Sequence, residues 1–566
     1  MSDDLDRRLA IAKQLLKRTP EVLDVPLGLN FVPVPFEDSL SHWLDHASAV
    51  SAGSAFAPAT LYVNIPFCAR VCTYCLLSAE NLPGKSDFQD YLEALGRHIA
   101  LYAPHVQSLS FGTLHVGGGT PTLLNETQLE RLFRDLQAFR LADGAPIGVE
   151  AHPGSTTEAK LRVMRDFGVT RISFGVESLT DAVLEAVNRG DQSTPKLRRA
   201  IEATRKLGMS VNIDLLAGLP EETGASWEQT LRETLELEPD SLSVNRYLAE
   251  NSELAKFGFG ADQQETQRVN HMLSFADQYI REHAPPRWPE EPLLTPGFGT
   301  QYVWDRSTNA RRYFQDDMIG PVSTLALGAG ALGHVFARNF NVPQGGPREY
   351  ARHILEGGAP PMLHATIDER FEAAFFAAEH ATKGGVSARE YSRIFKQPLS
   401  RLFNRELRFL VEQGLLEARG ETLATRSPSD LDFLQLLTFL SNDVTMLEAH
   451  ARRLDVPPPQ RRSDVELQDA EHVEAWVKTR AAQGVTDVVV DLGAGVDANL
   501  ATRLAQAAKR NKLRLEVISE GDRVSAQYRM LEAQLPPSML WVRLSIRASR
   551  AGRGASTLAS STSGIS

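Results

Sequence analysis

Between residues 61 and 247 the chain alternates short apolar runs, rich in β-branched residues, with longer amphipathic segments. Six apolar runs stand out: LYVNI (61–65), LHV (114–116), IGVEA (147–151), RISFGV (171–176), VNIDLLAG (211–218) and SLSVNRY (241–247). Segments of helical periodicity separate them, such as DFQDYLEALGRHIALYA and TQLERLFRDLQAF. This alternation predicts βα units around a parallel sheet. Six such units suit an α/β fold built as a full or partial βα barrel, in which functional groups gather at the carboxyl ends of the strands.

Other parts of the chain carry different patterns. A Pro-rich stretch, APPRWPEEPLLTPGFG, and a Gly-rich one, STLALGAGALGHVF, follow the repeats and are expected to close the barrel domain. Three amphipathic segments from ERFEAAFF onward and the short hairpin LEARGETLATR predict a winged-helix module. The sequence thus predicts five parts: an N-terminal helical arm (1–55), the barrel with its closing segment (56–350), the winged-helix module (351–435), a small α/β accessory domain (436–548) and a disordered tail (549–566).

Composition excludes several classes of protein. A chain of 566 residues with 3 cysteines, all in one cluster, is not a disulfide framework, and this cysteine usage predicts the reducing cytoplasm. We find no apolar signal core and no run of roughly 20 apolar residues, so we expect no membrane span. The formal net charge of −11 gives no general electrostatic footprint for nucleic acid, so we expect no nucleic-acid partner.

The three cysteines lie together in IPFCARVCTYC, as Cys68, Cys72 and Cys75. Thiolates spaced CxxxCxxC can converge on one iron-sulfur cluster while leaving one coordination position without a cysteine. A zinc site is the main alternative, although such sites usually close with four ligands in paired knuckles, and no second CxxC or CxH lies nearby. The third possibility is that the three thiols bind no metal. Spacing alone leaves all three open.

Further motifs follow the cysteine loop in a fixed order: VGGGTPTLL (116–124), VEAHP (149–153), RISFGVESL (171–179), VNRGD (187–191), NIDLLAGLPEET (212–223) and LALGAGALGH (325–334). Together with IPFCARVCTYC they resemble the radical S-adenosylmethionine (SAM) superfamily. They resemble in particular its oxygen-independent coproporphyrinogen III dehydrogenase-like family, which includes heme chaperones, anaerobic heme-degrading enzymes and radical SAM methyltransferases and cyclopropanases. The resemblance covers roughly residues 55 to 430.

The resemblance implies a 4Fe-4S cluster held by Cys68, Cys72 and Cys75, with one iron left for the amino and carboxylate groups of SAM. It also implies that Gly118, Gly119 and Thr120 form the edge that holds the SAM amino group. Glycines allow such close backbone approach to a ligand. A Gly run of this kind is, by itself, more often an ordinary strand-to-helix turn.

Further implied SAM contacts are single side chains at strand and helix ends. Glu150 can accept hydrogen bonds from an ammonium or a hydroxyl group, although it could also be a surface carboxylate. Arg189 suits the SAM carboxylate, because a guanidinium fork pairs with it, and the alternative is a solvated arginine. Asp214 lies between apolar neighbours, where an unpaired charge is costly, and its implied role is to accept from a ribose hydroxyl. Glu177 stands where many relatives carry Gln, and Tyr74 is expected to shield the cluster, meet the adenine or pack the loop.

These expectations imply a radical SAM enzyme that cleaves SAM to a 5′-deoxyadenosyl radical and modifies an organic small molecule, by methyl or methylene transfer or on a tetrapyrrole or natural-product intermediate. An electron donor such as flavodoxin or ferredoxin is the implied partner, and a second SAM molecule is an option that no residue decides. The alternatives are a heme chaperone and a coproporphyrinogen III dehydrogenase.

Three features separate the chain from coproporphyrinogen dehydrogenases and heme chaperones. Leu77 replaces a cysteine that the dehydrogenases commonly have, and NFVPVPFEDSL shows no match to their arginine-containing arm. The extension beyond the winged-helix region is longer than in heme chaperones. Its DLGAGVDANL resembles the first motif of a SAM-dependent methyltransferase, but we expect an accessory domain there. His115, His152 and His334 show no paired metal spacing and are expected to be structural or solvent-facing, although His334 is a candidate to approach a substrate.

Overall fold

The structure is a computed structural model, and it describes the larger part of the chain. The described residues are 2–17, 31–52, 59–75, 80–81, 84–247, 263–283, 293–295, 299–303, 322–382, 385–419, 422–425, 436–437, 439–442, 447, 487–494, 514–520 and 542–547. They divide into two compact units, residues 1–29 with 33–447 and residues 30–32 with 448–566.

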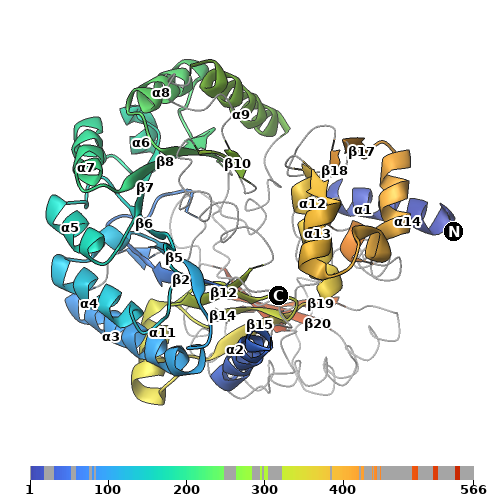
Figure 1. Cartoon of the computed structure of the whole chain (residues 1–566), viewed down its shortest axis with the longest axis horizontal. Coiled ribbons are helices and arrows are strands. Elements are labelled where there is room, and N and C mark those ends of the chain that lie inside the picture. The colour runs from blue at the N-terminus through green and yellow to red at the C-terminus, as the bar shows by residue number, and fades with distance from the viewer. Residues whose placement is uncertain are drawn as a thin grey trace. The chain divides into compact units, whose positions relative to one another are not determined.

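Six parallel strands form the centre of the first unit, as the repeats predicted. They are β2 (Ala59–Ile65), β5 (Phe111–Gly118), β6 (Ile147–Ala151), β7 (Arg171–Glu177), β8 (Ser210–Ala217) and β9 (Ser241–Arg246), paired in that order. The helices between them are α3 (Lys85–Tyr102), α4 (Glu126–Leu136), α5 (Glu158–Asp166), α6 (Asp181–Ala186), α7 (Thr194–Lys206) and α8 (Gly224–Glu236). Figure 1 shows the sheet curved into an arc with these helices along its outer side. The α/β barrel-like fold class is therefore confirmed.

Local sequence signals explain where several of these helices begin. Asn125 accepts a hydrogen bond from the backbone of Gln128 and receives one in return, which closes a capping box at the start of α4. Thr223 caps α8 in the same way, and Thr157 accepts from the amide of Lys160 at the start of α5. Each of these helices thus begins after a connecting segment that follows the strand before it.

Further strands, most of them antiparallel, extend the sheet at both sides, and the sequence pattern missed most of them. On one side, β12 (Ser323–Leu327) runs parallel to β2, and β13 (Gly333–Val335), β14 (Asn339–Pro343), β15 (Met362–Thr366) and β1 (Val32–Val34) follow. On the other side, β11 (Gly299–Val303) and β10 (Leu293–Thr295) follow β9. Three further helices, α2 (Phe36–Ser51), α9 (Gln263–His283) and α11 (Pro347–Gly357), add to this domain. These strands are short and paired over long sequence distances, so periodicity carries little signal for them.

A separate apolar core holds three helices and a small sheet together. The helices α12 (Glu369–Thr382), α13 (Ala388–Phe395) and α14 (Leu399–Glu412) are followed by a hairpin of β17 (Leu416–Arg419) and β18 (Thr422–Thr425), which also pairs with β16 (Val386–Ser387). This is the order predicted for a winged-helix module. The N-terminal helix α1 (Ser2–Lys17) contributes Leu5, Leu9 and Ala12 to the same core.

The second unit contains a parallel sheet of β19 (Asp487–Ala494), β20 (Arg514–Glu520) and β21 (Val542–Arg547), in that order. The motif DLGAGVDANL begins within β19, and its last six residues lie outside the described part of the chain, as do Leu77 and the predicted disordered tail (549–566). In the described part, no helix has both the length and the apolar character that a membrane crossing requires.

Candidate functional site

The cysteine loop leaves the carboxyl end of β2 and is tied to the barrel by backbone contacts. Cys68 ends the short strand β3 (Phe67–Cys68), which pairs with β4 (Glu80–Asn81). Farther along, the Val71 amide donates to Oδ1 of Asn81 at 3.1 Å, and Nδ2 of Asn188 donates to the Val71 carbonyl at 2.8 Å. None of the three cysteines forms a disulfide, and each is of intermediate exposure. The loop therefore presents three reachable sulfur atoms beside the strand ends.

The glycines after β5 lie against the start of this loop. Gly118 has a φ of +106°, and a Cβ at this position would lie 1.8 Å from Oδ1 of Asn64. A Cβ on Gly119 would lie 2.6 Å from the carbonyl oxygen of Phe67. Thr120, the next residue, donates its hydroxyl to Sγ of Cys68 at 3.5 Å. Only glycine fits at these two positions, so the backbone of β5 can reach the cysteine loop.

Glu150, on β6, is held by two donors at this edge. The amide of Gly118 donates to its Oε2 at 2.9 Å, and Nε2 of His115 lies 2.9 Å from its Oε1. A carboxylate only accepts, so His115 carries the proton of this contact. The His115 ring also stacks on Tyr62, with centroids 5.8 Å apart. The Glu150 side chain is 39% exposed, which leaves it accessible to a ligand.

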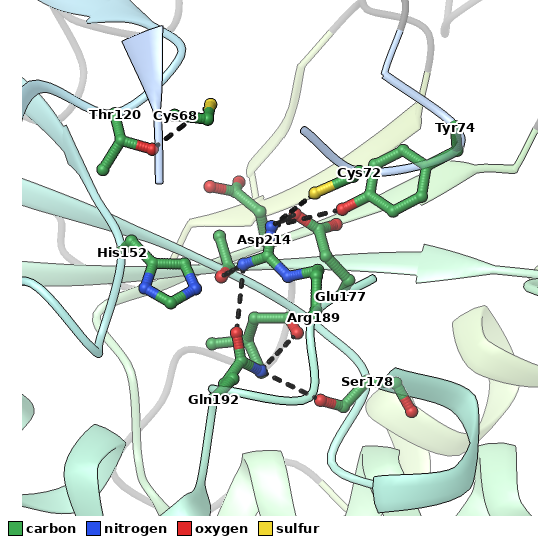
Figure 2. Close-up of polar contacts among 12 residues, drawn as sticks. Cys68, Cys72, Tyr74, Thr120, His152, Glu177, Ser178, Arg189, Gln192 and Asp214 are labelled. Carbon is green, nitrogen blue, oxygen red and sulfur yellow. Dashed lines mark hydrogen bonds and ion pairs between the residues drawn. The ribbon is translucent and has the colours of Figure 1, made fainter. Parts of the chain in front are cut away.

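Arg189 connects the cysteine loop to the carboxyl end of β7 (Figure 2). Its Nη1 donates to Sγ of Cys72 at 3.5 Å and to the hydroxyl of Tyr74 at 3.3 Å. Its Nη2 donates to the carbonyl of Gly175 and, at 3.0 Å, to Oε1 of Gln192. Arg189 is buried, so the solvated arginine considered from the sequence is not what the structure shows.

Glu177 ends β7 beside this guanidinium, with Oε1 3.8 Å from Nη1 of Arg189. Its φ of +65° is uncommon for a residue with a side chain. Burial raises the pKa of Glu177 to about 7; Arg189 and a hydrogen bond with Tyr74 oppose this rise, whereas Asp214 and Glu150 add to it. Burial also raises the pKa of Tyr74, which keeps its hydroxyl neutral.

Asp214, on β8, belongs to a buried polar network inside the barrel. The Ser173 hydroxyl donates to its Oδ2 at 2.7 Å, and Nδ2 of Asn212 lies 2.8 Å from its Oδ1. Asn212 in turn accepts from the hydroxyl of Ser241 at 2.6 Å. These donors satisfy a carboxylate that would otherwise be costly to bury. They also fix the direction of this side chain on β8.

The donor set of the cysteine loop fits an iron-sulfur cluster. In the described residues, no three His, Cys, Asp or Glu side chains are grouped as around a single metal ion. The three thiols of a cluster site each bind a different iron, so they surround a body larger than one ion. Reachable thiols on one loop, next to a backbone edge that admits no Cβ at Gly118 or Gly119, suit such a body.

The sequence did not identify every residue around these groups. His115, expected to be structural, contacts Glu150, and Gln192 and Ser173 orient Arg189 and Asp214. His115 could have been noticed because it lies two positions before Gly117 and so shares one face of β5 with it. His334, considered near a substrate, instead lies between the Val322 carbonyl and Glu372 of α12.

His152 follows β6 and is drawn close to Arg189 in Figure 2. Its Nδ1 accepts from the Gly154 amide at 3.1 Å, so in the neutral ring Nε2 carries the proton. Burial, together with the nearby charge of Arg189, lowers the pKa of His152 to about 4, so the ring is neutral at pH 7.

Comparison with known proteins gives a family match for the segment that builds this site. The family model described as the Radical SAM superfamily matches residues 62–234. Oxygen-independent coproporphyrinogen III oxidase of Synechocystis sp. is 37% identical over 204 residues, which are 35% of this chain and 44% of the relative. The chain thus spans less than half the length of this relative.

Two other proteins match over a longer stretch. The heme chaperone HemW of Bacillus subtilis is 26% identical over 368 residues, which cover 63% of this chain and 92% of that protein. Among solved structures, the coproporphyrinogen III oxidase HemN of Escherichia coli aligns with a TM-score of 0.57 over 73% of this chain and 95% of that one, at 22% identity. This last similarity concerns the fold alone.

Proposed function

We propose that the chain is a radical SAM enzyme acting on an organic small molecule, from the premise that residues 62–234 match the Radical SAM superfamily model. Cys68, Cys72 and Cys75 would hold a 4Fe-4S cluster. When bound, cluster and SAM together supply a 5′-deoxyadenosyl radical that abstracts hydrogen from carbon. The protein itself binds, orients and excludes water and oxygen.

One observation carries the proposal: the buried cation Arg189 contacts both Cys72 of the cysteine loop and Glu177 at the carboxyl end of β7. A ligand placed beside the loop would therefore meet a guanidinium for its carboxylate. It would also meet Glu150 for its ammonium group, beside the Gly118 amide and within the edge formed by Gly119 and Thr120.

Asp214 and Tyr74 would complete the SAM site. Asp214 has fixed neutral donors and could accept from a ribose hydroxyl. Tyr74 packs beside the apolar cluster of Val183, Val187, Leu216 and Leu219, where it could meet the adenine. Glu177 would lie near the ribose or the methionyl part, and a second SAM molecule is compatible with this assignment without being required by it.

The substrate that we favour is a tetrapyrrole or a natural-product intermediate. The reaction would be methyl or methylene transfer, or a modification of the tetrapyrrole. Leu77 in place of a further cysteine speaks against direct decarboxylation of coproporphyrinogen. An electron donor such as flavodoxin or ferredoxin would supply the reducing electron. Cysteines without a disulfide in this loop suit the reducing cytoplasm.

A heme chaperone is the second candidate, because similarity to HemW covers 92% of that protein. Heme titration with and without SAM separates the two functions. Stable heme transfer with no SAM consumption beyond slow abortive cleavage would refute the enzyme.

The direct test is anaerobic reconstitution with iron and sulfide, followed by incubation with reductant, SAM and candidate substrates. We expect absorbance near 400 nm, several irons and sulfides per chain, and 5′-deoxyadenosine. Replacing any of Cys68, Cys72 or Cys75 with Ala should abolish both the cluster and the product. Thr73→Ser, an exposed change in the same loop, is the matched control and should retain both. Retention of cluster and product by any one cysteine variant would contradict the assignment.

A further inference from the structure

We propose that Glu177 is the resident counter-ion of Arg189, which SAM must displace, so that this carboxylate weakens and gates SAM binding. The inference rests on the proposed function, because it takes Arg189 as the partner of the SAM carboxylate. In this role Glu177 weakens SAM binding, whereas a simple contact residue would strengthen it.

Nη1 is the nitrogen of the Arg189 guanidinium that remains for a ligand carboxylate, because Nε is buried and Nη2 is already engaged. Nη2 already donates to the Gly175 carbonyl and to Gln192, which hold it in place. Nη1 faces Cys72, Tyr74 and Glu177, and Glu177 is the carboxylate that pairs with it, at 3.8 Å. A SAM carboxylate that pairs with Arg189 therefore approaches the side on which Glu177 already lies.

The other carboxylates of the site have partners other than Arg189, which sets Glu177 apart. Asp214 is held by Ser173 and Asn212, and Glu150 is held by His115 and a backbone amide. Glu177 instead has Arg189 as its ion-pair partner, and its side chain is only 14% exposed. If SAM takes over the guanidinium, Glu177 becomes a buried charge without its counter-ion, which is costly.

Protonation of Glu177 removes its charge and so avoids this cost. Its pKa is raised to about 7, chiefly by burial and also by Asp214 and Glu150, against the lowering effects of Arg189 and Tyr74. When SAM removes Arg189 as a partner, the pKa rises again, so binding takes up a proton. The affinity for SAM should therefore fall as pH rises through about 7. Gln, which many relatives carry at this position, is neutral. It would leave no charge without a counter-ion and would take up no proton.

The test is equilibrium dialysis of SAM against the anaerobically reconstituted protein at pH 6 and pH 8. At pH 8, Glu177→Gln should bind SAM about threefold to tenfold more tightly than wild type, which corresponds to about 0.7–1.4 kcal/mol. Glu177→Ala removes the carboxylate without adding an amide, and it should shift the affinity in the same direction. The weakening between pH 6 and pH 8 should be smaller in both variants.

The matched control is Glu158→Gln, which removes an exposed carboxylate paired with Arg162 on α5 and should leave SAM affinity unchanged. Equal or weaker SAM binding by Glu177→Gln and Glu177→Ala, with wild type binding normally, would overturn this inference and leave the proposed function intact. A wild-type protein that retains a cluster and binds no SAM would overturn the proposed function itself.

Discussion

Replacing Gly118 with Ala tests the closest backbone approach at the site. The φ of Gly118 is +106°, and an added Cβ would lie 1.8 Å from Oδ1 of Asn64 and 3.2 Å from the Ile65 amide nitrogen. The variant therefore faces a backbone penalty and a collision. We expect it to destabilise the fold and to weaken SAM binding together, because the Gly118 amide also donates to Glu150.

The magnitude follows from the contacts that must change. A left-handed backbone costs a residue with a side chain roughly 1–2 kcal/mol. Asn64 would have to move, and it makes two hydrogen bonds, from the Tyr62 hydroxyl at 3.2 Å and to the Ala329 carbonyl at 2.5 Å. Each is worth about 0.5–1.5 kcal/mol. The free energy of unfolding should therefore fall by about 2–5 kcal/mol.

Two other glycines separate the two contributions. Gly208 has a φ of +77° with nothing within 4 Å of an added Cβ, so Gly208→Ala should cost only the backbone penalty. Gly224 has open space and no left-handed φ, so Gly224→Ala should be neutral or stabilising. Urea unfolding followed by circular dichroism gives the three values. A Gly118→Ala variant no less stable than Gly208→Ala would refute the collision with Asn64.

Two further predictions concern buried charges away from the cysteine loop. Burial raises the pKa of Glu222 to about 7, above its value in the unfolded chain. The protonated form therefore stabilises the fold at low pH, and this stability, about 3 kcal/mol, is lost as the pH rises from about 4.5 to 7. Between pH 5 and pH 8, Glu222→Gln should lose less free energy of unfolding than wild type, and an equal loss would contradict this reasoning. Arg8 of α1 bonds Glu406 of α14 at 3.2 Å, so Arg8→Ala should cost about 3 kcal/mol in urea unfolding. Arg7→Ala, an exposed neighbour, should cost under about 0.5 kcal/mol, and equal losses would argue against the Arg8 contact.

Much of the fold could be predicted because its signals are local. Apolar β-branched runs and capping residues such as Asn125 and Thr223 mark strands and helix starts within a few residues. The antiparallel strands β13 to β15 escaped prediction because their pairing partners are set by contacts far along the chain. Short strands of this kind have no amphipathic repeat to reveal them.

The sequence by itself determined the thiol cluster, the glycine edge and the charged residues at strand ends, because parallel strands bring their carboxyl ends to one side of a sheet. The partners of those residues were decided only by the tertiary structure. His115 against Glu150, Asn64 against Gly118 and Glu177 against Arg189 join residues of different strands or loops. The physical reason is that a charge's burial and its counter-ion depend on distances of a few ångströms, which residue spacing along the chain does not encode.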